Sequence, residues 1–111
     1  MKVCLNIQAG ACGFETKVTA TCTDMKQLTK INVESNCEKI NALGSRIREV
    51  QGLEEISQGF NGVVMSQART VIKGCCAGCV VPAGIFKAVQ VASGLALPKD
   101  IVFTMSKEEK Y

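Results

Sequence analysis

The stretch FETKVTATC, residues 14–22, decides the fold that we expect for this chain. Its apolar or small residues stand at every second position, which is the pattern of a strand with one buried face. The series expected to face the core is Phe14, Thr16, Val18, Ala20 and Cys22. The segment therefore predicts a central strand of an antiparallel sheet.

The segments on either side of this strand continue the sheet. Val3, Leu5 and Ile7 alternate with polar residues, and the Gly10–Gly13 turn joins this first strand to the second, so the two should pair antiparallel. After a turn at residues 23–26, the segment 28–33 is rich in β-branched residues. The first third of the chain therefore predicts a three-stranded antiparallel meander.

Helical patterns follow the meander. Ser35 and Glu38 have the spacing of a capping box, and the helix that they begin should end at Gly52. A short helical turn is expected at residues 53–57, a second helix at 63–72, and a third at about 80–93, with Gly94 as its terminator. A final strand is expected at residues 101–105.

This order predicts the α+β class: a three-stranded antiparallel β-meander plus a C-terminal strand, packed against three helices. A chain of 111 residues is expected to form one domain. We place this single domain at residues 1–106 and a solvated tail at 107–111.

Composition argues against several functions. The net charge of +3 is mild and the charges are scattered, which does not favour a nucleic-acid partner. Lys87 and Gln90 interrupt the most hydrophobic stretch, so we expect no membrane span. The N-terminus lacks the apolar run of a signal peptide. We therefore expect a cytoplasmic protein, in which clustered thiols bind metals or act in redox chemistry more often than they form structural disulfides.

Five of the seven cysteines are expected to meet at one end of the fold. When sequential elements run up and down beside each other, the turn with Cys12 and the helix start with Cys37 fall at the same end. Two helices later, Cys75, Cys76 and Cys79 return to that end. The spacing of Cys76 and Cys79 is that of a C-x-x-C pair, which can bind one metal ion.

Their positions favour thiolate chemistry. Cys37 and Cys79 stand near helix starts, where an anion is favoured, and the thiolate is the form that binds metals. Cys12 lies close to two glycines that leave the backbone room for a bound group. Because the chain has no histidine, its donor set favours an iron–sulfur cluster, with zinc as the alternative.

Other interpretations remain open. Cys4 and Cys22 stand in strands, far from the other five, and are expected to act as small core residues. A thiol-disulfide redox protein could use Cys76 and Cys79, although a thioredoxin-like motif normally follows a strand. The chain could also be a metal-free interaction module. An enzyme is the less favoured class, because isolated carboxylates without histidine offer no catalytic set.

Three motifs resemble the U-type iron–sulfur cluster scaffold family. These are Gly10-Ala11-Cys12-Gly13, Ser35-Asn36-Cys37-Glu38 and the segment CVVPAGIFKA from Cys79 to Ala88. The resemblance implies that Cys12, Cys37 and Cys79 are cluster ligands and that protein partners take part in cluster or sulfur transfer. The chain departs from the family at Phe14, where the family has aspartate, and at Gly78, where it has histidine.

A second resemblance is to a small uncharacterised family of prokaryotic proteins, common in anaerobes, and rests on CVVPAGIFKAVQVASGLALPKD, residues 79–100. It implies no mechanism. Together these observations predict a thiolate-based metal-binding or cluster-scaffold protein that could form a homodimer. Its principal ligands would be Cys12, Cys37 and Cys79, with Cys76 as the fourth and Cys75 as its competitor.

Overall fold

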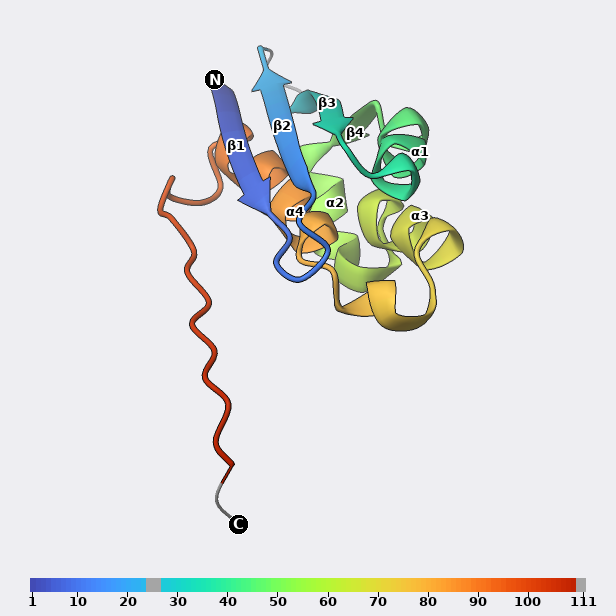
Figure 1. Ribbon diagram of the computed structural model, residues 1–111. Helices are drawn as coiled ribbons and strands as arrows, with labels where there is room; N and C mark the ends of the chain where they lie inside the picture. Colours follow the sequence, from blue (N-terminus) through green and yellow to red (C-terminus); the bar gives the residue numbers. More distant parts are fainter. Residues whose placement is uncertain (24–26, 110–111) are drawn as a thin grey trace.

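A four-stranded antiparallel sheet forms one layer of the protein, and helices cover one of its faces (Figure 1). The computed structural model describes residues 1–23 and 27–109. The strands are β1 (Lys2–Gln8), β2 (Glu15–Cys22), β3 (Leu28–Ser35) and β4 (Glu49–Gln51), in the spatial order β1-β2-β3-β4. The predicted meander and the α+β class are confirmed. The predicted turn at residues 23–26 lies mostly outside the described residues.

The strand register explains which side chains enter the core. Leu5 pairs with Val18, and Val18 pairs with Val33, so that apolar residues of the three strands share the helix-covered face. Thr16, Val18, Ala20 and Cys22 are buried, as the alternation in β2 predicts. Phe14 is the exception, because β2 begins after it and its side chain is 41% exposed.

The helical layer contains α1 (Glu38–Arg46), α2 (Gly52–Gln58), α3 (Val63–Val71) and α4 (Val81–Ala92), with short 3₁₀ turns η1 (Gly59–Asn61) and η2 (Gly74–Gly78). α4 lies against β1 and β2 and fills the centre of the core (Figure 1). Its buried residues are Val81, Pro82, Ile85, Ala88, Val89, Val91 and Ala92.

Two glycines allow helices to approach the sheet closely. A Cβ atom added to Gly84 of α4 would lie 2.5 Å from Cδ1 of Ile7, and one added to Gly44 of α1 would lie 2.7 Å from Cβ of Val33. Contacts this short are not tolerated in folded proteins. A Cβ at Gly44 would require α1 to move, because Val33 Cβ is fixed to the strand, whereas a Cβ at Gly84 would require at least the end of the Ile7 side chain to move. Gly84 therefore leaves room for the Ile7 side chain between β1 and the start of α4.

A buried carboxylate holds α3 in place. Glu55 of α2 is buried, and its two oxygens accept hydrogen bonds from the backbone N–H groups of Val63 and Val64, at 3.1 and 2.7 Å. These donors belong to the first turn of α3, where no backbone partner is available within the helix. A Cβ on Gly62 would collide with the same carboxylate.

The start of α1 differs from the predicted capping box. The helix begins at Glu38, its N-cap is Cys37, and no side chain caps it. Ser35 Oγ instead accepts a hydrogen bond from the backbone N–H of Cys37 at 3.0 Å, and the Ser35 backbone pairs with the amide of Asn41. The predicted capping box is wrong because Ser35 is the last residue of β3, so the N-cap of α1 lies two residues later, at Cys37.

The fourth strand is not the one that the sequence predicts. α1 ends at Arg46 rather than at Gly52, and Glu49–Gln51 form β4, whose Val50 pairs with Thr29 of β3. The prediction of a strand at residues 101–105 is wrong for the single chain. These residues are extended, but they pair with no strand among those described.

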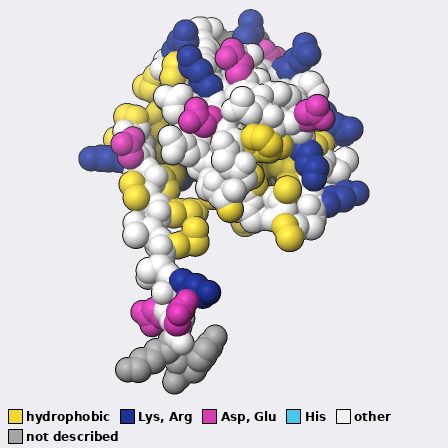
Figure 2. Space-filling view, in the orientation of Figure 1, with side chains coloured by type: hydrophobic (Ala, Val, Ile, Leu, Met, Phe, Trp, Pro, Cys, Tyr) yellow, Lys and Arg dark blue, Asp and Glu magenta, His cyan; other side chains and the backbone are white. Residues whose placement is uncertain are grey.

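The chain after α4 forms an extended arm, residues 95–109, that runs away from the body (Figure 1). Hydrophobic side chains follow it outside the body (Figure 2). Ile101, Val102, Phe103 and Met105 are 59%, 79%, 70% and 89% exposed. The arm helps to explain why the molecule measures 53 Å along one axis and 27 and 24 Å along the others. The predicted domain boundary at residue 106 stays a prediction.

One stretch of the described chain, Gly74–Ala92, is long and apolar enough to cross a membrane by length and composition, although it consists of η2 and α4 with the extended residue Cys79 between them. The sequence predicts that Lys87 and Gln90 interrupt this stretch, but its mean hydropathy stays at 1.6 with both residues in it. Within the fold, however, α4 occupies the centre of the core and contributes seven buried residues to it. Its apolar character is accounted for by this position in a compact domain.

Candidate thiol site

Cysteine-bearing segments from three parts of the chain reach the same end of the molecule. Gln8 pairs with Glu15, and Thr16 pairs with Ser35, so the β1–β2 turn and the start of α1 lie at one end of the sheet. Asn36 joins them directly: its backbone N–H donates to Glu15 O, and its side-chain oxygen accepts from Glu15 N–H, both at 3.2 Å.

The third segment arrives through α3 and η2. Gly84, in the first turn of α4, contacts Ile7 near the end of β1, so the preceding residues lie at the same end. The β1–β2 turn and the chain around η2 are both seen on the lower side of the body (Figure 1). We call this region the thiol pole and define it by Cys12, Cys37 and the segment Cys75–Cys79.

The five cysteines of the pole differ in burial. Cys37 and Cys79 are half-buried and pack against the hydrophobic core, whereas Cys12, Cys75 and Cys76 are exposed, and all five are free thiols. Cys37 is the N-cap residue of α1, and Cys79 stands just before Val80, the N-cap of α4. The predicted placement of these two residues near helix starts is confirmed.

The C-x-x-C segment forms a closed turn. The backbone N–H of Cys79 donates to the carbonyl oxygen of Cys76 at 3.0 Å, which is the hydrogen bond of a four-residue turn. The ends of such a turn have Cα atoms less than about 7 Å apart. The backbone therefore brings the two residues together, and the separation of their sulfurs depends on the side-chain rotamers.

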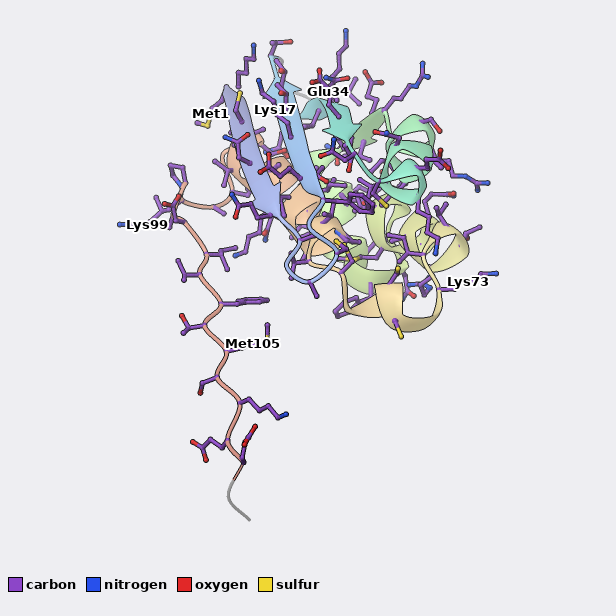
Figure 3. The ribbon with its side chains drawn as sticks, in the orientation of Figure 1. Met1, Lys17, Glu34, Lys73, Lys99 and Met105 are labelled. Atoms are coloured by element: carbon purple, nitrogen blue, oxygen red, sulfur yellow. The ribbon has the colours of Figure 1, made fainter. Side chains whose placement is uncertain are left out.

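One side-chain contact connects α1 with η2 across the pole. The Lys39 ammonium donates a hydrogen bond to the Cys76 sulfur at 3.9 Å, and both side chains are exposed. An ammonium group is a favourable neighbour for an anionic sulfur. Lys73, just before η2, lies at the edge of the same end of the molecule (Figure 3).

Cys12 lies in a loop with unusual backbone freedom. Gly10 and Gly13 have φ angles of +90° and +72°, which side chains other than glycine rarely adopt, and a Cβ on either glycine would meet open space. The turn is closed by a hydrogen bond from Gly13 N–H to Gly10 O at 2.9 Å. Nothing described here packs over Cys12, which is exposed.

The side chains do not form a ready-made ligand set. Within residues 1–23 and 27–109, no group of three or more cysteine and acidic side chains lies close enough together to hold a metal ion. The backbone thus brings the three segments to one pole without bringing three sulfurs to one point. Loop and side-chain movement would have to complete a site.

The two remaining cysteines lie elsewhere. Cys22 is buried in the core, as expected, but Cys4 is exposed because β1 is an edge strand and Cys4 points to its outer face. Lys17 and Glu34, which pair across β2 and β3, mark this uncovered polar face of the sheet (Figure 3).

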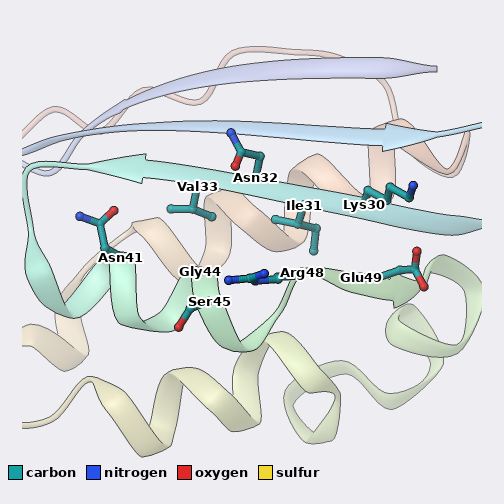
Figure 4. A pocket seen from close by; sticks show the side chains of 9 residues that line it. All are labelled: Lys30, Ile31, Asn32, Val33, Asn41, Gly44, Ser45, Arg48 and Glu49. Carbon is teal, nitrogen blue, oxygen red and sulfur yellow. The ribbon is translucent and has the colours of Figure 1, made fainter.

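The sequence interpretation missed a groove between β3 and α1. Its volume is about 720 Å³, and its walls carry Lys30, Asn32, Asn41, Ser45, Arg48 and Glu49 (Figure 4). Cysteine is absent from its lining, so it is separate from the thiol pole. The signal that could have found it is the run of polar residues on one edge of β3, but helix surfaces show the same pattern.

The fold and the pole define a small α+β domain with a cysteine-rich end. The chain belongs to a family of unknown function, DUF6951, whose model matches residues 3–105. Neither the curated proteins nor the solved structures contain a match to it. The expectation of an uncharacterised family is therefore confirmed.

Proposed function

We propose that this protein binds a thiophilic metal centre, most simply an iron–sulfur cluster and alternatively zinc, through cysteines of the thiol pole. The observation that supports this proposal is the convergence of free thiols from three separate chain segments at one end of the fold. Packing of the core does not explain this convergence, because three of the five thiols are exposed.

The residues divide into two kinds. Cys37 and Cys79 are anchored against the core and would supply fixed ligands. Cys76 is joined to Cys79 by the turn and would supply a third, with exposed Cys75 as its competitor. Cys12 would complete the set from the β1–β2 turn. Thiolates of this kind suit iron–sulfur clusters and tetrahedral zinc.

The absence of a preformed cluster of ligands among the described residues bears on the kind of site. The segments that must move are exposed: the glycine-flanked Cys12 loop and η2. A site that closes from exposed loops over two anchored thiols would release its metal more readily than a buried one. This property suits a scaffold or transfer protein of the cytoplasm, which delivers a cluster or sulfur to a protein partner.

Metal analysis of protein purified without oxygen tests the proposal. We expect iron and acid-labile sulfide, or zinc, to be bound, and we expect the bound metal to fall at least tenfold when Cys12, Cys37 and Cys79 are all replaced by serine. The matched control is Cys4→Ser, which changes an exposed thiol outside the pole. Undiminished metal in the triple variant would reject the assignment.

A thiol redox function is the second candidate, because the turn hydrogen bond holds the Cα atoms of Cys76 and Cys79 within the separation that a disulfide tolerates. Oxidation would join the two sulfurs, release two protons and pass two electrons to an acceptor such as oxidised glutathione. A redox titration with glutathione, followed by mass spectrometry, should then find this disulfide at a defined potential. Failure to form it under mild oxidants would remove this candidate.

A further inference from the structure

The arm carries a strand pattern without a strand partner. Ile101, Val102, Phe103 and Met105 are β-branched, aromatic or long apolar residues, and all four are exposed. In an extended chain, Ile101, Phe103 and Met105 share one face. Exposed apolar segments of this kind mark an interaction site in a soluble protein. Within the described chain, the bonds of the arm are local: Leu95 N–H donates to Gln90 O, Lys99 N–H donates to Leu97 O, and Lys107 forms an ion pair with Glu109.

The sheet has an open edge at β1 to which such a segment could add. This strand is at the edge of the sheet, and among the described residues only β2 pairs with it, so its outer backbone groups are unpaired with any strand. Its core-facing residues Val3, Leu5 and Ile7 are only half-buried. Long open edges are normally covered in native proteins, since they otherwise pair with other chains.

The dimensions of the two elements agree. The five residues 101–105 span about 16 Å when extended, and the seven residues of β1 span about 23 Å, at about 3.3 Å per residue. A strand added beside β1 would place one apolar row of the arm next to the half-buried row of β1. The added strand would therefore cover both the open edge and the exposed apolar residues.

The course of the arm points to a second copy of this chain. Lys99 lies beside the body, while Met105 lies beyond it, so residues 101–105 are directed away from their own β1 (Figure 3). The family model extends to residue 105 and therefore includes residues 101–105, the part of the arm with a strand pattern. A segment that belongs to the domain but leaves its body suits exchange between copies.

We propose that the protein forms a homodimer in which residues 101–105 of each copy add as a fifth strand to β1 of the other. The exchange is reciprocal, so both open edges and both arms are covered in a closed assembly. This inference does not depend on metal binding, because the arm lies outside the thiol pole.

Truncation and sedimentation test the exchange. We compare the full chain, a chain that ends at Met105 and a chain that ends at Asp100 by analytical ultracentrifugation at several concentrations. The first two should sediment as dimers and the third as a monomer of half the mass. If the shortest chain does not fold, as judged by circular dichroism, Phe103→Asp replaces it, with Ser106→Asp as the matched control.

Hydrogen exchange separates pairing between copies from pairing within one chain. In the full chain, amides of residues 101–105 and of β1 should gain protection as the concentration rises through the dimerisation range. A full chain that stays monomeric would overturn the proposal, as would protection of the arm that is independent of concentration. A dimer that survives both removal of residues 101–111 and Phe103→Asp would place the interface elsewhere and overturn it too.

Discussion

At the scale of single residues, Glu55 stabilises the helical layer through its two carboxylate oxygens. Replacement by alanine leaves the N–H groups of Val63 and Val64 without their acceptors, and the site is buried at Val64. We expect Glu55→Ala to lower the free energy of unfolding by about 1–3 kcal/mol, measured by urea denaturation. Glu55→Gln should cost less, because its carbonyl oxygen still accepts one of the two bonds.

The matched control for this substitution is Glu54→Ala. Glu54 stands next to Glu55 in α2, but its side chain is exposed. Its loss should change stability by less than about 0.5 kcal/mol. Equal effects of the two alanine substitutions would show that the buried carboxylate does not hold α3.

A second residue, Gly84, sets the distance between a helix and the edge of the sheet. Valine at this position would place a Cβ 2.5 Å from Ile7 Cδ1, so either the Ile7 side chain or the start of α4 would have to shift. We expect Gly84→Val to cost about 1–3 kcal/mol in stability, as overpacked cores do. In this variant, hydrogen exchange of the backbone amides should accelerate most in β1. Ala83→Val, at an exposed position of the same helix, should leave both properties nearly unchanged.

At the scale of elements, the meander was predictable and the fourth strand was not. The strict alternation in β1 and β2 has only one structural meaning, so the strands and their antiparallel pairing followed from it. Ile47 and Val50, by contrast, fit a helix as well as a loop and short strand. Residues 101–105 have strand character, but strand formation depends on a partner edge, which local sequence does not encode.

The candidate site was predictable only in part: the placement of its segments was, and the positions of its sulfurs were not. The order of the elements was enough to bring Cys12, Cys37 and the C-x-x-C segment to one end, since this follows from the direction of each strand and helix. The approach of individual sulfurs was not predictable, because it depends on rotamers and loop conformations. The contact between Lys39 and Cys76 illustrates this, as its residues are far apart in the sequence.

The link between α1 and η2 gives a prediction at this scale. Lys39→Met removes the ammonium from Cys76 but keeps a long side chain. Because the ammonium group contacts this sulfur directly, we expect its removal to change the rate at which Cys76 reacts with iodoacetamide, measured by peptide mass spectrometry. Reaction at exposed Cys4 serves as the internal reference and should not change. An unchanged ratio of the two rates would show that the contact has no chemical effect.

At the scale of the whole molecule, the account rests on thiols of separate segments closing on one metal centre. X-ray absorption at the metal edge, on protein loaded without oxygen, tests this claim most directly. We predict sulfur ligands at about 2.3 Å, unchanged in Cys4→Ser and lost when Cys12, Cys37 and Cys79 are replaced by serine. A metal surrounded only by oxygen and nitrogen, or a sulfur shell that persists in the triple variant, would contradict it.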